Sequence, residues 1–97
     1  MKLDRNRIIK IIRNHKGELI QKYSLKSIAL FGSYATEKQQ SESDIDLLID
    51  FTKPIGMEIV DLAMDLEELL KAKVDLVTFN AVKNRLLKKI ENELIYV

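Results

Sequence analysis

The chain has 97 residues, which suits a single domain over residues 1–97 and suffices to bury a core without disulfide or metal staples. It contains no cysteine, so it has no disulfide framework, thiolate metal site or thiol nucleophile, and this suits a cytoplasmic protein. The net charge of +1 combines a basic N-terminal quarter with an acidic middle, where we expect the acidic chemistry to lie. No unbroken apolar run resembles a signal peptide or a membrane span, so we expect no membrane partner.

The first predicted element is a helix that begins after Asp4, a residue type that caps helix N-termini. Apolar residues recur at helical spacing from Ile8 to Tyr23, and lysine and arginine fill many positions between them. Gly17 lies inside this pattern, so the pattern is compatible with one bent helix or with two short ones.

A buried strand is predicted over residues 25–31, because the apolar segment LKSIALF is followed at once by Gly32. One helical turn over 33–37 and a polar loop over 38–43 follow it. The alternation of polar and apolar residues from Asp44 predicts a second strand, whose apolar face carries Ile45, Leu47, Ile49 and Phe51.

Two further helices, over 57–72 and 81–94, flank a third strand over 73–79. The expected apolar face of the first of these helices carries Val60, Ala63, Met64, Leu66, Leu69 and Leu70. The opposite face is an acidic stripe that consists of Glu58, Asp61, Asp65 and Glu68. Such a charged stripe is typical of a helix face in solvent. The order of elements predicts an α/β or α+β fold, in which helices pack on a small sheet.

Asp44 and Asp46 are the first candidate site residues. Side chains two apart on a strand share one face and lie about 6.6 Å apart along it, so the two carboxylates repel unless a cation lies between them. Carboxylate oxygens suit Mg²⁺, which usually takes one or two carboxylates together with phosphate oxygens. The pair therefore predicts Mg²⁺ and a phosphate-bearing substrate.

Gly32 and Ser33 fit such a substrate, because glycine lets the backbone approach an anion and Ser33 offers a hydroxyl at the start of a helical turn. Asp75 is the best-placed third carboxylate, and we assign it the roles of shared metal ligand and general base. Asp50 is its rival, but four strand positions separate it from Asp46 by about 13 Å.

Gly32-Ser33 followed by the segment SDIDL at 43–47 resembles the nucleotidyltransferase signature of the DNA polymerase β superfamily. With the motif on the first two strands and a third acid at Asp75, the chain most resembles the minimal nucleotidyltransferase (MNT) proteins, which are commonly antitoxin partners of HEPN proteins. The resemblance implies a mixed sheet backed by helices. It also implies Mg²⁺-dependent transfer of a nucleoside monophosphate from a triphosphate, with release of pyrophosphate.

By this resemblance Gly32 and Ser33 bind the nucleotide, while Asp44, Asp46 and Asp75 form the catalytic and metal-binding triad for two Mg²⁺ ions. The implied reaction transfers AMP from ATP to a hydroxyl of a partner HEPN toxin, with tyrosine as the leading acceptor, and makes the chain the antitoxin. Its size supports a macromolecular acceptor, since no residues remain for a domain that would enclose a small one.

The chain departs from the family pattern at one place. Where the family usually continues Gly-Ser-x-Ala with Arg-Gly, this chain has Thr36 and Glu37, so a positive charge and a glycine are replaced by a hydroxyl and a negative charge. The alternative function is therefore a non-catalytic antitoxin that neutralises its toxin by direct binding. Nucleotidyl transfer to RNA is a weaker hypothesis, because no aromatic residues interleave the basic runs and those runs fit solvated helix faces. Apolar positions on the terminal helices suit either a toxin interface or a homo-oligomer.

Overall fold

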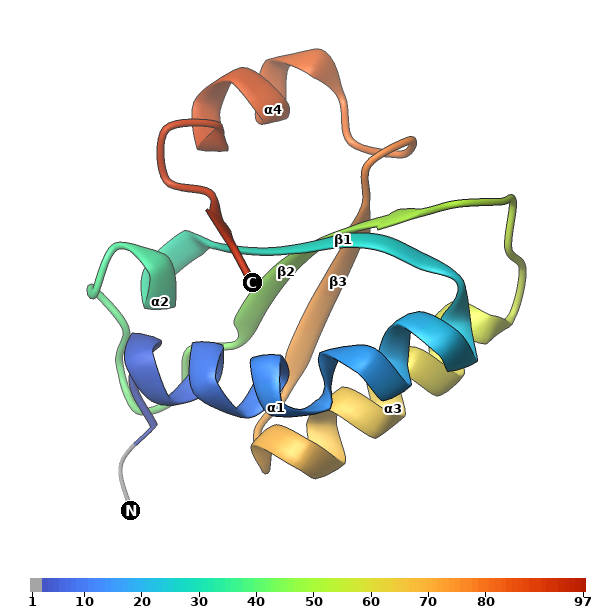
Figure 1. Ribbon diagram of the computed structural model, residues 1–97. Coiled ribbons are helices and arrows are strands. Elements are labelled where there is room, and N and C mark those ends of the chain that lie inside the picture. Colours follow the sequence, from blue (N-terminus) through green and yellow to red (C-terminus); the bar gives the residue numbers. More distant parts are fainter. Residues whose placement is uncertain (1–2) are drawn as a thin grey trace.

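A single four-stranded sheet organises the computed structural model, which describes residues 3–97 (Figure 1). The strand order is β3-β2-β1-β4, with β1 antiparallel to β2 and β4 and with β2 parallel to β3. The elements are α1 (Arg5–Tyr23), β1 (Leu25–Phe31), α2 (Gly32–Ala35), β2 (Ile45–Phe51), α3 (Glu58–Leu70), β3 (Val74–Thr78), α4 (Asn84–Ile90) and β4 (Ile95–Tyr96). The predicted mixed α/β architecture is confirmed.

The first helix begins and continues as its sequence suggests. The carboxylate of Asp4 accepts a hydrogen bond of 2.9 Å from the backbone N–H of Arg7, which is the predicted N-cap. Of the two alternatives at Gly17, the structure has one continuous helix. It ends at Ser24, which takes a left-handed conformation with φ of 56° and turns the chain into β1.

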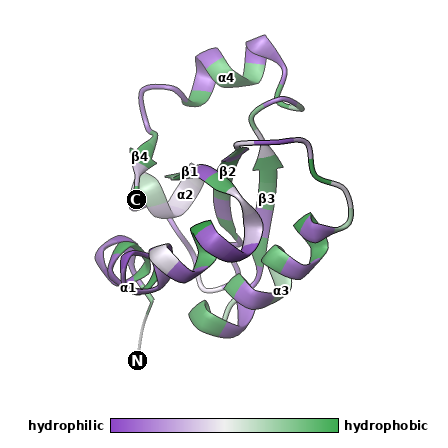
Figure 2. Cartoon of the chain, turned by 45° about the vertical axis from the view of Figure 1, so that its right-hand side comes forward, coloured by the Kyte–Doolittle hydropathy of each residue, from purple (hydrophilic) through white to green (hydrophobic). Residues whose placement is uncertain are grey.

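Helices α1 and α3 cover one face of the sheet, and α4 lies over the other face (Figure 1). In Figure 2 the strands carry mainly hydrophobic colours, whereas the helices show both hydrophobic and hydrophilic segments. The larger core lies beneath α1 and α3 and takes in Ile45, Leu47 and Ile49, as predicted for the apolar face of β2. The smaller cluster, on the α4 side, consists of Ala29, Phe31, Leu48 and Ile90.

The predicted apolar face of the third helix is partly wrong. In α3 the buried positions are Leu62, Leu66 and Leu70, whereas Met64 is 62% exposed and Val60 is 46% exposed. Positions four residues apart lie on one side of a helix, so the three leucines form a narrow line against the core. Apolar residues surround much of this helix, and the packing selects which of them are buried.

The predicted final helix over 81–94 is too long, and the structure has a fourth strand that the pattern did not indicate. The backbone N–H groups of Ala81 and Val82 donate to the carbonyl of Thr78, so a tight turn follows β3 before α4 begins. Beyond α4 the chain returns to the sheet, and the backbone N–H of Val97 donates to the carbonyl of Ile28. This pairing with the edge of β1 takes the C-terminal residues out of the helix.

The bounds of the other elements differ from the predictions by at most one or two residues at each end. Among the helices between residues 3 and 97, none combines the length and the apolar character needed to cross a bilayer.

The buried line of α3 yields a stability prediction. Leu66 is fully buried, so Leu66→Ala removes core contacts and leaves a cavity, and we expect it to lower the free energy of unfolding by about 3 kcal/mol. Met64→Ala on the exposed side of the same helix should lower it by less than about 1 kcal/mol. Urea denaturation measures both, and equal losses would contradict the assignment of the buried face.

Candidate active site

The turn at Gly32 lies directly against the carboxylate of Asp46. Gly32 has φ of 78°, the left-handed region that favours glycine, and it begins α2 immediately after β1. Phe31 pairs with Asp46 across the antiparallel strands, which brings the turn over the Asp46 side chain. A Cβ atom at Gly32 would collide with an Asp46 carboxylate oxygen. Both the backbone conformation and the contact therefore require glycine here.

Asp46 and Asp75 lie side by side on neighbouring strands. The register of the parallel β2–β3 pair places them directly opposite each other, so their side chains project from the same face of the sheet, the face that carries Phe31 and α4. Asp44 lies just before β2 and, like Asp75, is exposed. The structure thus places Asp46 and Asp75 opposite each other, with Asp44 two residues before Asp46 in the chain.

The environment of Asp46 makes its ionisation unfavourable. The pKa of Asp46 is raised from 3.8 to about 6, first by burial and then by the negative charges of Asp75, Asp44 and Glu93. Asp50, the rival to Asp75, lies at the other end of β2, where it pairs with Ser27 and its carboxylate is 3.9 Å from the ammonium of Lys26. Asp50 is therefore not part of the carboxylate cluster, by which we mean Asp44, Asp46, Asp75 and Glu93.

Glu93 is a member of the cluster that the sequence reasoning missed. Its Oε1 accepts a hydrogen bond of 2.9 Å from the backbone N–H of Gly32, although the two residues are 61 positions apart in the chain. Glu93 follows α4 in the segment that leads to β4, within the range predicted to be helical. A lone glutamate in such a segment carries no local signal of this contact.

These carboxylates fit a hard divalent cation that also takes ligands from a substrate. Within the described residues no three His, Cys, Asp or Glu side chains are already gathered closely enough to enclose a metal ion. Mg²⁺ commonly binds with one or two carboxylates and completes its coordination with water and phosphate oxygens. Burial and, after it, repulsion by the neighbouring carboxylates raise the pKa of Asp46, and such a cation would relieve the repulsion.

The backbone at Glu37 takes a conformation typical of glycine, although Thr36 and Glu37 replace the Arg-Gly of the family pattern. Glu37 takes a left-handed conformation with φ of 59°, at the position where the family pattern has glycine. The hydroxyl of Thr36 donates to the carbonyl of Gly32 at 3.2 Å. Arg5 of α1 reaches this segment, and its Nη2 lies 3.0 Å from Oε1 of Glu37. A guanidinium is therefore present here, but its charge is paired with a carboxylate.

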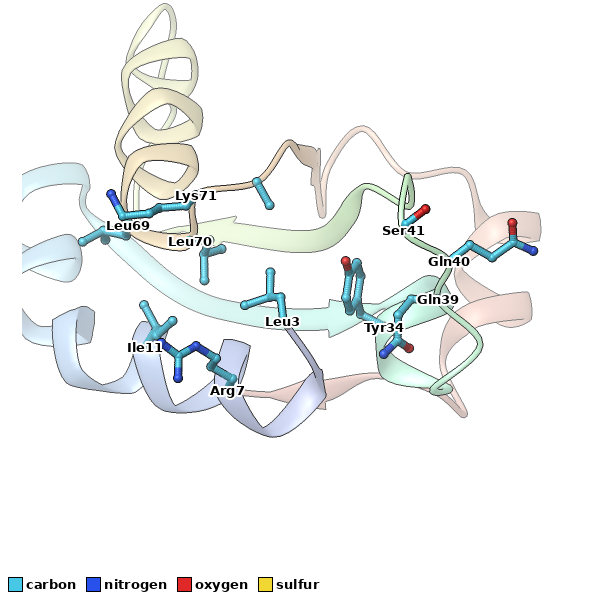
Figure 3. A pocket seen from close by; sticks show the side chains of 11 residues that line it. Leu3, Arg7, Ile11, Tyr34, Gln39, Gln40, Ser41, Leu69, Leu70 and Lys71 are labelled. Atoms are coloured by element: carbon cyan, nitrogen blue, oxygen red, sulfur yellow. The ribbon is translucent and has the colours of Figure 1, made fainter. Parts of the chain in front are cut away.

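A cavity of about 580 Å³ opens on the α1 and α3 side of the sheet (Figure 3). Tyr34 lines it, next in the chain to Ser33, together with Arg7 and Lys71. Neither Gly32 nor any carboxylate of the cluster lines this cavity. The candidate site is instead on the other face of the sheet.

Comparison with known proteins assigns the family. The polymerase β nucleotidyltransferase profile matches residues 6–97. A predicted protein adenylyltransferase of Methanocaldococcus jannaschii is 50% identical over 92 residues, which cover 93% of this chain and 94% of that protein. Protein adenylyltransferase MntA of Thermococcus cleftensis is 35% identical over 88 residues, which cover 90% of this chain and 89% of that one.

Solved structures give the same assignment. A candidate minimal nucleotidyltransferase superposes with a TM-score of 0.80 at 26% identity, covering 96% of this chain and 95% of that one. A toxin–antitoxin structure with AMP-PNP gives 0.70 at 28% identity, covering 97% and 72%. A complex of tri-AMPylated Shewanella oneidensis HEPN toxin with MNT antitoxin gives 0.60 at 26% identity, covering 95% and 66%.

Gly17 in α1 and Gly32 in α2 allow a matched test of the close approach between Gly32 and Asp46. Gly32→Ala places a methyl group against Asp46 at a positive φ, so we expect it to lower the free energy of unfolding by at least about 2 kcal/mol. Gly17→Ala meets no atom within 4 Å and should raise it by about 0.5–1 kcal/mol. Chemical denaturation distinguishes them, and a Gly32→Ala variant of unchanged stability would contradict the close approach.

The raised pKa of Asp46 predicts a stability difference that depends on pH. Because its folded-state pKa lies above the ordinary value of 3.8, ionisation of Asp46 destabilises the fold increasingly as the pH rises from 3.8 through about 6. In EDTA at about pH 8, Asp46→Asn should therefore melt at a higher temperature than the unsubstituted protein, and the difference should shrink towards about pH 4. A gap in melting temperature that stayed constant across this range would count against the charge cluster.

Proposed function

Because this chain belongs to the polymerase β nucleotidyltransferase family, we propose that it is a protein adenylyltransferase that transfers AMP from ATP to a HEPN-family toxin and so acts as the antitoxin. The observation that carries the proposal is the Gly32 turn lying against Asp46, with Asp75 beside Asp46 on the next strand. The relatives named as protein adenylyltransferases and the solved complexes with HEPN toxin support the choice of reaction and partner.

Asp44, Asp46 and Asp75 would hold the Mg²⁺, which when bound supplies positive charge against the triphosphate and the departing pyrophosphate. Because glycine has no side chain, the Gly32 turn lies against Asp46, so it would hold the phosphates beside the metal-binding carboxylates, where the hydroxyl of Ser33 would donate to a phosphate oxygen. The AMP-PNP in the toxin–antitoxin neighbour supports a nucleoside triphosphate as the donor.

In the transfer step the acceptor hydroxyl oxygen forms a bond to the α-phosphorus of ATP. The bond from the α-phosphorus to the oxygen that bridges to the β-phosphate breaks, and pyrophosphate leaves. The hydroxyl proton passes to the carboxylate of Asp75, which is exposed and can therefore meet an acceptor presented by another protein. Tyrosine suits this base, since its phenol has a pKa near 10 and loses its proton more readily than an aliphatic hydroxyl.

A non-catalytic antitoxin is the second candidate function. It is favoured by the ion pair between Arg5 and Glu37, because this pair neutralises the guanidinium that lies near the Gly32 turn. With less positive charge left for the triphosphate, direct binding of the toxin would be the remaining route to neutralisation.

Intact mass spectrometry separates the two functions. The protein is incubated with its cognate HEPN toxin, ATP and Mg²⁺, and both chains are weighed. We expect an AMP-sized gain on the toxin with the unsubstituted protein and none with the Asp44→Ala/Asp46→Ala variant, with the modified residue located by fragmentation. Asp50→Ala, which removes a carboxylate from the far end of the same strand, is the matched control and should retain transfer. A stable complex without any mass gain would favour the binding antitoxin.

A further inference from the structure

The carboxylate of Glu93 is held in place by the chain on both sides of it. The backbone N–H of Glu93 donates to the carbonyl of Ile90 at 2.9 Å, which forms a turn at the end of α4. Four residues later, the N–H of Val97 donates to the carbonyl of Ile28 at 2.9 Å. The segment that carries Glu93 is thus held by a backbone hydrogen bond on each side, and the Glu93 side chain accepts a hydrogen bond from the N–H of Gly32.

This carboxylate adds negative charge to a place that already has three acids. Its Oε1 accepts a hydrogen bond from the N–H of Gly32, and Gly32 itself lies against the Asp46 carboxylate, so the charge of Glu93 acts within the proposed site. The amide of Gly32 compensates by donating a hydrogen bond, and a bond to an ionised acceptor is stronger than one between neutral groups. Glu93 is therefore both a hydrogen-bond partner of the Gly32 turn and a fourth acidic side chain near it.

We propose that Glu93 is a positioning and specificity-determining residue, whose hydrogen bond holds the Gly32 turn and whose charge disfavours a nucleoside triphosphate that arrives without a divalent cation. The proposal rests on the proposed function, since it takes the Gly32 turn as the nucleotide site. Repulsion between the carboxylate and the ligand grows with the ligand's negative charge. A metal-free triphosphate is more negative than its Mg²⁺ complex, so Glu93 penalises the metal-free form more strongly.

Two substitutions separate the two roles. Glu93→Gln keeps a side-chain oxygen that can accept the Gly32 hydrogen bond but removes the charge, whereas Glu93→Ala removes both. Glu91→Gln is the matched control, because it makes the same change of charge at an exposed position two residues away. The backbone N–H of Glu91 bonds to the carbonyl of Leu87, and this substitution leaves that bond intact.

The affinity for AMP-PNP is measured by titration calorimetry in EDTA and in Mg²⁺, and the ratio of the two Kd values gives the preference for the metal complex. We expect Glu93→Gln to reduce this ratio by about tenfold and Glu91→Gln to change it by less than about twofold. In the protein without nucleotide, the NMR signal of the Gly32 amide should move less in Glu93→Gln, which keeps an acceptor oxygen, than in Glu93→Ala, which removes it.

A ratio in Glu93→Gln equal to that in Glu91→Gln would overturn the charge role, and an unshifted Gly32 amide in Glu93→Ala would overturn the positioning role. Either result leaves the proposed function standing if the unsubstituted protein binds AMP-PNP with Mg²⁺. If that protein fails to bind AMP-PNP under both conditions, the proposed function fails and the role of Glu93 in nucleotide discrimination fails with it.

Discussion

The approach of the Gly32 turn to the Asp46 carboxylate is the constraint on which the rest of the site depends. It requires a residue without a side chain at a positive φ, and it requires that Phe31 and Asp46 stay in register. The register is held from the opposite face of the sheet, where Ile45 and Leu47 are fully buried beneath α1 and α3. A slip of one residue would turn these side chains out of the core and the acids into it, so the stability of the core also maintains the site.

The site itself works against stability. Asp46 is partly buried among Asp75, Asp44 and Glu93, and its raised pKa measures the cost of ionising it there. Such a cluster persists because the larger hydrophobic core lies on the other side of the sheet and does not depend on it. The face of β2 beneath α1 and α3 is therefore part of the larger core, whereas the face towards α4 carries Leu48 of the smaller apolar cluster and the carboxylate of Asp46, whose negative charge a divalent cation would neutralise.

The departure from the family pattern at Thr36 and Glu37 alters charge and preserves backbone shape. Glu37 adopts the left-handed conformation that a glycine would take there, and the Thr36 hydroxyl donates to the carbonyl of Gly32. Arg5 restores a guanidinium from a different helix, although Glu37 pairs with it. Any effect of this departure should consequently fall on the neutralisation of phosphate charge, since the path of the chain past Ser33 is kept.

The sequence by itself determined the features that follow from local periodicity and short spacing. The apolar segment before Gly32, the alternation after Asp44 and the Asp4 cap predicted β1, β2 and α1, and the strand assignments at Asp46 and Asp75 predicted two acids that prove to be neighbours. Within these elements the side-chain period alone indicates which face each residue takes.

Only the tertiary structure decided which side of α3 is buried, where α4 ends and that Glu93 meets Gly32. The first depends on the helix rotating Leu62, Leu66 and Leu70 towards the core when apolar residues lie on several of its sides. The other two depend on the C-terminal residues pairing with the edge of β1, a contact between segments far apart in the chain. Local patterns carry no record of such pairings, because the free energy that decides them is gained only when the distant segments pack together.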